Sequence, residues 1–281
     1  MSDSPELPDL ASTLQLDYFQ AGIMDRACEG MRHRKSPPFA ILLQALEGHY
    51  EIQCAGRAFK LYPGQTAFIP ANTPVEFVHR AGPSGYLRAQ WLHFYYSCLG
   101  VIDFLSLLKL PLLLPESLSE NLGPLLTAAR DTDEAGPGNL APDIRRYQVA
   151  ASVLDALVAV SEVRKDSLFS TRLQRVLPAL LHIDKNLAAP FGVKHLARLC
   201  GLSESRFHAV FSEEFACSPM HYVRRKRLER AARLLVSGNE KLAAVAEDTG
   251  FADAFHLSHA FKRHYGLSPL LYRRQARALW E

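Results

Sequence analysis

The sequence has little of what marks secreted, membrane or metal-binding proteins. Its five cysteines are odd in number and never form a CxxC pair, so neither a disulfide framework nor a zinc ribbon is predicted. The most apolar stretches, VIDFLSLLKLPLLL and AASVLDALVAVSEV, are interrupted by charges or proline and are too short to span a membrane. The opening MSDSPELPDL is acidic and lacks the apolar core of a secretory signal. We therefore expect an intracellular, cytoplasmic protein with reduced thiols at Cys28, Cys54, Cys98, Cys200 and Cys217.

A strong excess of charge is also lacking, because the formal net charge of the 281 residues is only +3. The charge is unevenly distributed, however. Residues before Ser170 contain 14 Lys and Arg against 19 Asp and Glu, whereas residues from Ser170 onward contain 18 against 10. The length favours two domains. The basic C-terminal part fits a polyanionic partner such as nucleic acid, although a solvated face can have the same composition.

Short strands are indicated between Phe39 and about Tyr96. The stretches FAILLQALEG, HYEIQCAG, RAFKLYPGQTAFIPANTP, VEFVHRAG and YLRAQWLHFYY are rich in alternating apolar, aromatic and β-branched residues. Gly, Pro and Asn separate them every eight to twelve residues. This part is predicted to be a small all-β barrel or sandwich.

The period becomes helical between about Cys98 and Arg164. The stretch DTDEAGPGN indicates an exposed loop, and Pro142 suits the first turn of a helix that runs to about Val163. Two apolar faces run along this helix. One is expected to pack on the barrel, and the other on a partner chain or on another part of the same chain. The first face repeats at heptad spacing through Ile144, Tyr147, Ala151, Leu154 and Val158, and the second contains Val153, Leu157 and Val160. The stretch RKDSLFS is a predicted linker, and helices are expected after it.

The C-terminal part contains an internal repeat. Ala197 and Gly201 recur 49 residues later, and Phe207, Phe211 and Pro219 recur after 50 as Leu257, Phe261 and Pro269. Each copy has a short helix, a glycine that suits a turn, and a second helix, which is the order of a helix-turn-helix. The apolar spacing places Phe207, Val210, Phe211 and Phe215, and likewise Leu257, Ala260, Phe261 and Tyr265, in two cores.

The remaining face of each second helix carries small, polar and imidazole side chains, which suit contact with base edges in a major groove. These residues are Ser205, His208, Ala209 and Ser212 in the first copy, and Phe255, Ser258, His259 and Lys262 in the second. Neighbouring basic residues are predicted to neutralise phosphates, namely Arg206, the run RRKR at 224–227 with Arg224 and Arg225 foremost, Arg263, Arg273 and Arg274. Ser218-Pro219 and Ser268-Pro269 are predicted helix starts, and HYVRRKRLERAARLLVSG is a predicted helix joining the two copies, with Val223, Leu228, Ala231, Leu234 and Leu235 turned inward.

At these residues the chain resembles the AraC/XylS family of bacterial transcription regulators. The resemblance covers about Leu173 to Arg274 and is carried by LARLCGLSESRFHAVFSEEF, by the pair Gly250-Phe251, by Phe261 to Arg263 and by GLSPLLYR. It implies two helix-turn-helix units that bind neighbouring major-groove segments of operator DNA and a contact with RNA polymerase.

Two departures from the family pattern stand out. Ala254 and Phe255 replace residues that are often polar in the family, so Phe255 is expected to touch a thymine methyl, and Ala216 replaces a glycine, which implies a less favourable left-handed cap or a different helix end.

The front half resembles, more weakly, the cupin-like sensor barrel of this family. Trp91 matches the position of the sugar-stacking tryptophan of the arabinose sensor, with filling of the core as the alternative. The candidate residues for a small-molecule effector, a sugar or related metabolite, are Trp91, Phe77, His93, Glu47 and Glu76. Val75 stands where metal-binding cupins have a histidine, and His33, His49, His79 and His93 share no ligand spacing, so no metal and no cofactor are predicted.

The predicted fold class is α+β. The expected parts are an N-terminal arm and cupin-like barrel over residues 1–97, a helical dimerisation and linker region over 98–169, and an all-α double helix-turn-helix domain over 170–281. We expect an effector-controlled transcription regulator that forms a homodimer and has no catalytic residues. Two alternatives stay open: a cupin-type enzyme with an accessory DNA-binding domain, which would need clustered histidines and a carboxylate, and an architectural nucleic-acid binder without an effector, which would need a filled barrel.

Overall fold

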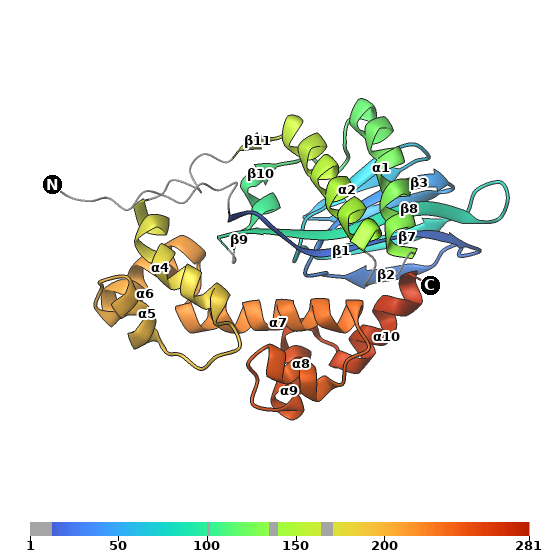
Figure 1. Cartoon of the computed structure of the whole chain (residues 1–281). Helices are drawn as coiled ribbons and strands as arrows, with labels where there is room; N and C mark the ends of the chain where they lie inside the picture. The colour runs from blue at the N-terminus through green and yellow to red at the C-terminus, as the bar shows by residue number, and fades with distance from the viewer. Residues whose placement is uncertain (1–12, 100–101, 135–139, 164–170, 281) are drawn as a thin grey trace. The chain divides into compact units, whose positions relative to one another are not determined.

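The computed structural model describes residues 13–99, 102–134, 140–163 and 171–280 (Figure 1). The chain forms two compact units, one rich in strands and one helical. The strand-rich unit contains Leu16–Tyr95, Leu108–Val163 and Arg277–Glu281, and the helical unit contains Met1–Gln15, Tyr96–Leu107 and Arg164–Ala276. The fold class is α+β, as predicted. The boundaries expected at residues 97/98 and 169/170 stay predictions, and the expected linker at 164–170 lies outside the described residues.

Two antiparallel sheets form the strand-rich unit. The first has the order β1 (Gln15–Arg26), β8 (Leu87–Cys98), β3 (Ala40–Glu47), β6 (Thr66–Ile69), with β9 (Ile102–Asp103) paired to β8. The second has the order β2 (Arg32–Lys35), β7 (Val75–Arg80), β4 (His49–Cys54), β5 (Arg57–Leu61). The strands predicted after Phe39 are all present, whereas β1 and β2 were not predicted.

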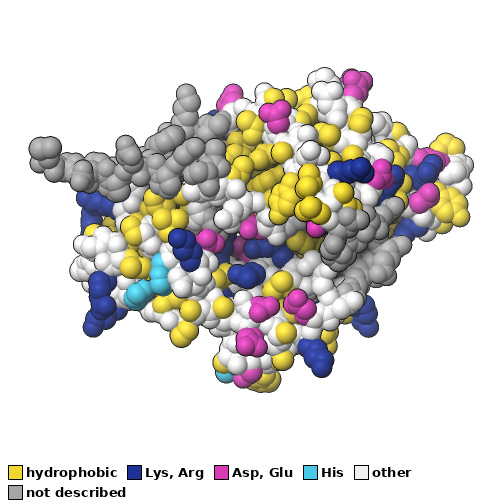
Figure 2. Space-filling view, viewed as in Figure 1, with side chains coloured by type: hydrophobic (Ala, Val, Ile, Leu, Met, Phe, Trp, Pro, Cys, Tyr) yellow, Lys and Arg dark blue, Asp and Glu magenta, His cyan; other side chains and the backbone are white. Residues whose placement is uncertain are grey.

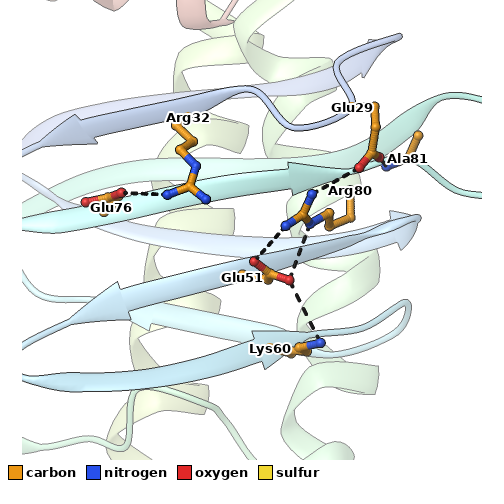
Figure 3. A network of polar contacts seen from close by, with 7 residues as sticks. All are labelled: Glu29, Arg32, Glu51, Lys60, Glu76, Arg80 and Ala81. Atoms are coloured by element: carbon orange, nitrogen blue, oxygen red, sulfur yellow. Dashed lines mark hydrogen bonds and ion pairs between the residues drawn. The ribbon is translucent and has the colours of Figure 1, made fainter.

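Alternation decides which side chains of the second sheet enter the interior. On its inner face Tyr50 and Phe77 are almost completely buried. Its outer face carries a network of opposite charges, in which Arg80 lies 3.2 Å from Glu29 and 3.1 Å from Glu51 (Figure 3). In the same network Arg32 lies 3.9 Å from Glu76 (Figure 3). The outer face is therefore solvated and charged, and the inner face belongs to the core.

The outward side of the first sheet packs on α1 (Glu116–Glu134). Gln44 of β3 donates to the carbonyl of Ser119 at 2.8 Å, and Gln90 of β8 donates to the carbonyl of Gly123 at 3.1 Å. A hydrogen bond of 2.7 Å joins the two glutamine side chains. This buried polar network is satisfied and fixes the register of the helix on the sheet.

The helix α2 (Leu140–Ala159) packs on α1. It begins close to Pro142 but ends at Ala159, so the predicted end near Val163 was wrong. Glu162–Val163 instead forms β11, which pairs with β10 (Leu108–Lys109), and η2 (Phe104–Leu107) is a 3-10 helix. The residues 131–134 of the expected loop lie in α1, and 135–139 lie outside the described residues. No described helix combines the length and apolar character that a membrane span requires.

The helical unit contains two groups of helices joined by a long one (Figure 1). The first group is α4 (Thr171–Lys185), α5 (Val193–Leu199) and α6 (Glu204–Phe215), and the second is α8 (Leu242–Asp248), α9 (Ala254–Tyr265) and α10 (Pro269–Trp280). The joining helix α7 (Pro219–Ser237) contributes Tyr222 and Val223 to the first core and Leu228, Ala231 and Leu235 to the second. The predicted double helix-turn-helix architecture is therefore confirmed.

Local sequence explains where these helices begin and turn. The hydroxyl of Ser203 caps α6, and the carboxylate of Asp253 caps α9 by accepting from the His256 backbone N–H at 2.7 Å. Gly201 and Gly250 have φ of +64° and +72° in the turns between the short and long helices. Ser218 caps α7, with Pro219 in its first turn, as predicted.

Candidate nucleic-acid interface and candidate effector site

The second helix of each repeat, α6 or α9, has one buried and one open face. In α6 Phe207, Val210 and Phe211 are buried, and in α9 Leu257, Ala260 and Phe261 are buried. Residues three and four apart share a face of a helix, so the alternate positions face away from these cores. All eight predicted base-facing residues are exposed or half-buried: Ser205, His208, Ala209, Ser212, Phe255, Ser258, His259 and Lys262. We call α6 and α9 the recognition helices.

Phe255 is the most unusual residue of this surface. Its side chain is 75% exposed in the first turn of α9. Large aromatic side chains normally enter a core or an interface, and this exposed one is available for contact with another molecule. A benzene ring offers apolar contact and no hydrogen bond, which matches a thymine methyl rather than a polar base edge.

The polar residues of the recognition helices have local partners that limit what they can offer DNA. The Ser212 hydroxyl lies 3.4 Å from Nδ1 of His208, so the other ring nitrogen of His208, Nε2, is the one that remains for a base. The Ser258 hydroxyl donates to the carbonyl of Ala254 at 2.7 Å, which leaves its oxygen as an acceptor. His208 is therefore a better candidate for direct base contact than Ser258.

Basic residues line hollows along the seam between α7 and α9. One hollow of about 240 Å³ is lined by His221, Arg224, Arg225, Leu228, Ala260, Arg263 and His264. A neighbouring hollow of about 640 Å³ shares Arg224 and Ala260 and reaches Phe251 and Phe255. Figure 2 shows Lys and Arg side chains at several points along the helical unit. The seam adjoins the open face of α9, so its arginines lie where the phosphates beside a groove would be.

The six predicted phosphate contacts divide into two groups. Arg206, Arg224, Arg263 and Arg274 are exposed. Arg273 is turned toward the protein, where it donates to the carbonyls of Leu235 and Glu240 at 3.2 and 2.7 Å. Arg225 lies 3.7 Å from the buried carboxylate of Glu229. A phosphate contact by Arg273 would require these hydrogen bonds to break, so it is the weakest member of the set.

Arg227, the last residue of RRKR, was expected to contact phosphates together with its neighbours, but its guanidinium is bound to the protein's own backbone. Its guanidinium donates to the carbonyls of Leu187, Ala189 and Gly250, each at 2.8 Å. The signal was its position: Arg227 precedes the inward Leu228 and lies one helical turn after the buried Val223, so it belongs to the inner side of α7. It is structural, not a surface charge.

Between the two sheets, the structure brings together three of the five predicted effector residues. Trp91 stacks on His93 with ring centres 4.3 Å apart, and both are almost completely buried. Phe77 of the opposite sheet is equally buried, and the ammonium of Lys35 lies 5.1 Å from the centre of its ring. A Cβ at Gly22 would come 2.4 Å from Cζ2 of Trp91, so β1 packs closely on the indole.

The structure does not bring Glu47 and Glu76 into this interior. Glu76 follows Val75 and precedes Phe77 along β7, so alternation turns it to the outer face, where it pairs with Arg34. Glu47 accepts a hydrogen bond from the backbone N–H of Ser84 at 3.1 Å, and hydrogen bonding to the side chain and the backbone of Ser84 lowers the pKa of Glu47. Both carboxylates thus have structural partners outside the interior.

Sequence reasoning also missed the titratable residues of the second sheet's inner face. Burial lowers the pKa of His33 to about 2 and that of His79 to about 4, and it lowers the pKa of Lys35 on the same face. Burial also lowers the pKa of the predicted His93 on the opposite sheet. His79 is completely buried, and its Nε2 has no hydrogen-bond partner among the described residues. A buried polar atom of this kind often marks a ligand site. The alternation of RHRK was the available signal, since His33 and Lys35 share a face.

Side chains that could ligate a metal do not cluster in the part of the chain that the structure describes. No group of three or more His, Cys, Asp and Glu side chains there could hold a metal ion. The closest such contact in the interior, 3.3 Å between Nδ1 of His79 and Sγ of Cys28, involves only two groups.

Comparisons with known proteins give a family match in the helical part of the chain. Residues 196–275 match a family model described as a helix-turn-helix domain. A putative AraC-like transcription regulator of Streptomyces lividans is 36% identical over 99 residues, which are 35% of this chain and 33% of the relative. The C-terminal part of the chain is an AraC-type helix-turn-helix domain.

The chain has relatives that are named as transcriptional regulators. The probable transcriptional regulator LumQ of Photobacterium leiognathi is 27% identical over 175 residues, which are 54% of this chain and 69% of LumQ. The match to the Streptomyces lividans relative, by contrast, spans only about a third of that protein's length.

A solved structure resembles almost the whole chain. ToxT from Vibrio cholerae O395, bound to (E)-4-(8-methylnaphthalen-1-yl)but-3-enoic acid, aligns with a TM-score of 0.56 at 11% identity, covering 92% of this chain and 99% of ToxT. At this identity the likeness concerns the fold. The two-part arrangement of an N-terminal β-rich part and a C-terminal double helix-turn-helix domain is therefore a known fold.

Proposed function

We propose that this protein is a transcription regulator that binds operator DNA in the cytoplasm with both recognition helices of one chain. The observation that carries the proposal is the repeat itself: residues 205, 208, 209 and 212 recur exposed or half-buried as 255, 258, 259 and 262. Two such helices, held by α7, suit successive segments of the major groove, which lie about 34 Å apart along a duplex. The regulator would then act on RNA polymerase, as other AraC-type proteins are expected to do.

Two substitutions test the DNA-binding assignment. His208→Ala should relax specificity at one base pair at a cost of about 1–3 kcal/mol, because a donor to a base edge is lost. Arg224→Ala should weaken binding to all sequences alike and reduce the salt slope by about 1, because one phosphate contact is lost. Both variants are titrated against a duplex selected from random DNA by the wild-type protein and against unselected DNA. Equal losses on the two DNAs for both variants would contradict the assigned roles.

The proposal includes a small-molecule effector between the two sheets. The supporting observations are Nε2 of His79 and Nδ1 of His33, which are buried on the inner face of the second sheet without a hydrogen-bond partner among the described residues. A sugar is one candidate, suggested by the family resemblance, although His93 and β1 already cover parts of the Trp91 indole. A small carboxylic acid is the second candidate, favoured by Lys35, whose ammonium would pair with it while an apolar body packs on Phe77.

A thermal-shift screen of the full chain distinguishes the two effector classes. Neutral sugars, sugar acids and fatty acids are compared at equal concentration, because a ligand that binds only the folded state raises its melting temperature. If the effector is an acid, the ligand should no longer raise the melting temperature of Lys35→Gln but should still raise that of Trp91→Ala. For a sugar, the shift should disappear in Trp91→Ala and persist in Lys35→Gln. A hit that shifts both variants as much as the wild type would contradict this site.

Dimerisation through α2 completes the proposed function. Leu140, Ile144 and Tyr147 are exposed to 74, 48 and 62%, and with Ala151 and Val158 they form an apolar stripe. Figure 2 shows hydrophobic side chains gathered over this helix. The heptad spacing of Ile144, Tyr147, Ala151 and Val158 suits a second copy of the same helix, because a two-fold interface joins identical surfaces. Leu154, the remaining residue of the predicted face, is instead buried within the chain.

A further inference from the structure

The two halves of the DNA-binding domain meet at a second junction besides α7. The loop after α4, residues 186–190, approaches the turn between α8 and α9 backbone to backbone. A Cβ at Gly250 would lie 2.6 Å from the carbonyl oxygen and 2.8 Å from Cα of Ala188. The φ of Gly250 is also positive, at +72°. Only glycine allows this approach and this turn together.

Arg227 holds this junction from α7. Two of its three hydrogen bonds reach the first half, at the carbonyls of Leu187 and Ala189, and the third reaches the second half, at the carbonyl of Gly250. The guanidinium is planar, and its donors have a fixed geometry, so three simultaneous bonds of 2.8 Å define the relative positions of the three carbonyls. The arginine therefore fixes how one recognition helix is rotated relative to the other.

We infer that Arg227 is a positioning residue that sets the spacing of the two base sequences bound by α6 and α9. The inference rests on the proposed binding of both helices to DNA. Inserting one base pair between the two sequences moves them apart by about 3.4 Å and rotates one relative to the other by about 35°. A rigid pair of helices cannot follow this change, whereas a pair joined by α7 alone has more freedom. Loss of Arg227 should therefore make the protein tolerant of wrong spacing.

The test measures spacing tolerance with the full chain. A duplex is selected from random DNA by the wild-type protein, and the base pairs bound by α6 and by α9 are located from their sensitivity to His208→Ala and His259→Ala. The spacing between these two sequences is then changed by inserting or removing one or two base pairs. The readout is the ratio of the Kd for altered spacing to the Kd for selected spacing.

Arg227→Ala should lower the ratio of the Kd for altered spacing to the Kd for selected spacing about tenfold, which is equivalent to about 1.4 kcal/mol. Arg227→Lys should behave like Arg227→Ala, because a single ammonium keeps the charge but cannot bridge three carbonyls. Arg230→Ala is the matched control: it removes an exposed arginine from the same helix and should keep the wild-type ratio. Duplexes with only one of the two sequences intact should bind the wild type and Arg227→Lys equally.

Circular dichroism establishes which variants are folded. Where Arg227→Ala does not fold, Arg227→Lys and Gly250→Ala carry the test, since Gly250→Ala strains the same junction from its other side. An unchanged spacing ratio in a folded Arg227 variant overturns the inference and leaves the proposed function intact. If the wild type prefers no sequence over random DNA, the proposed function fails and the inference fails with it.

Discussion

Ala216 occupies a backbone conformation that glycine adopts at the equivalent place in the second repeat. Its φ is +52° at the end of α6, and that of Gly266 is +74° at the end of α9. Of the two outcomes expected from the sequence, the structure therefore has the left-handed cap, and α6 does not end differently. The left-handed conformation destabilises a residue with a side chain by about 1–2 kcal/mol relative to glycine. Part of the advantage of glycine is offset because glycine gives the unfolded chain greater conformational freedom.

Ala216→Gly should consequently stabilise the helical unit by about 0.5–1 kcal/mol. Chemical denaturation of the full chain, followed by far-UV circular dichroism, measures the change. Gly266→Ala is the converse experiment, because a Cβ there meets no atom within 4 Å and adds only backbone strain. It should destabilise by a similar amount, and a stabilising Gly266→Ala would contradict the explanation.

Single residues also mark the limit of what the sequence predicts. Arg227 stands in a run of four basic residues, and its three bonds depend on two carbonyls about forty positions earlier in the chain and one that lies 23 positions later. His33 and Lys35 alternate with Arg32 and Arg34, a composition typical of a solvated segment. Only their pairing with β7 turns His33 and Lys35 inward beside Phe77. Contacts between distant segments decided both cases.

At the scale of elements, the sequence predicted those whose pattern is local. The strands from β3 to β8 alternate and are bounded by turn residues, and the helices of both repeats have periodic apolar faces and caps. The strand β1 was missed because QLDYFQAGIMDR mixes polar and apolar residues without a clear period. The helix α2 ends early because β11 pairs with β10, a contact that helical periodicity does not reveal.

The helix α2 provides a prediction at this scale. Tyr147→Glu should convert a dimer into a monomer, because it places a charge in the middle of the apolar stripe. Ser152→Glu adds the same charge one position beyond Ala151, away from the stripe, and should leave the dimer intact. Analytical ultracentrifugation measures both. A wild-type chain that is monomeric at high concentration, or a dimer that tolerates Tyr147→Glu, would contradict the α2 interface.

At the scale of the whole molecule, the strand-rich unit should lose stability in acid. Burial holds the pKa of His79 at about 4 and that of His33 at about 2, below the usual histidine value near 6.5. Below that value the unfolded chain binds protons that the folded strand-rich unit does not bind. The free energy of unfolding should therefore fall as the pH falls from about 6.5 toward 4.

Thermal unfolding between pH 8 and pH 5 measures this effect. This range avoids most titration of Glu29 and Glu51, whose pKa values are lowered by hydrogen bonds. The melting temperature of the strand-rich unit should decrease in this range, and His79→Asn should decrease less. His208→Ala removes an exposed imidazole and serves as the control, because its melting curve should follow that of the wild type. A strand-rich unit equally stable at pH 8 and pH 5 would contradict the burial of these histidines.

The unequal chemistry of the two recognition helices gives the DNA target a direction. Ser205 in the first repeat corresponds to the exposed Phe255 in the second, so one helix offers a hydroxyl where the other offers a ring. Under the proposed binding mode, one chain therefore distinguishes the two ends of the DNA that it covers, and the segment bound by a single chain is not palindromic. Turning such a site around on the chromosome would turn the bound protein with it, so that orientation as well as position would decide which neighbouring gene it controls.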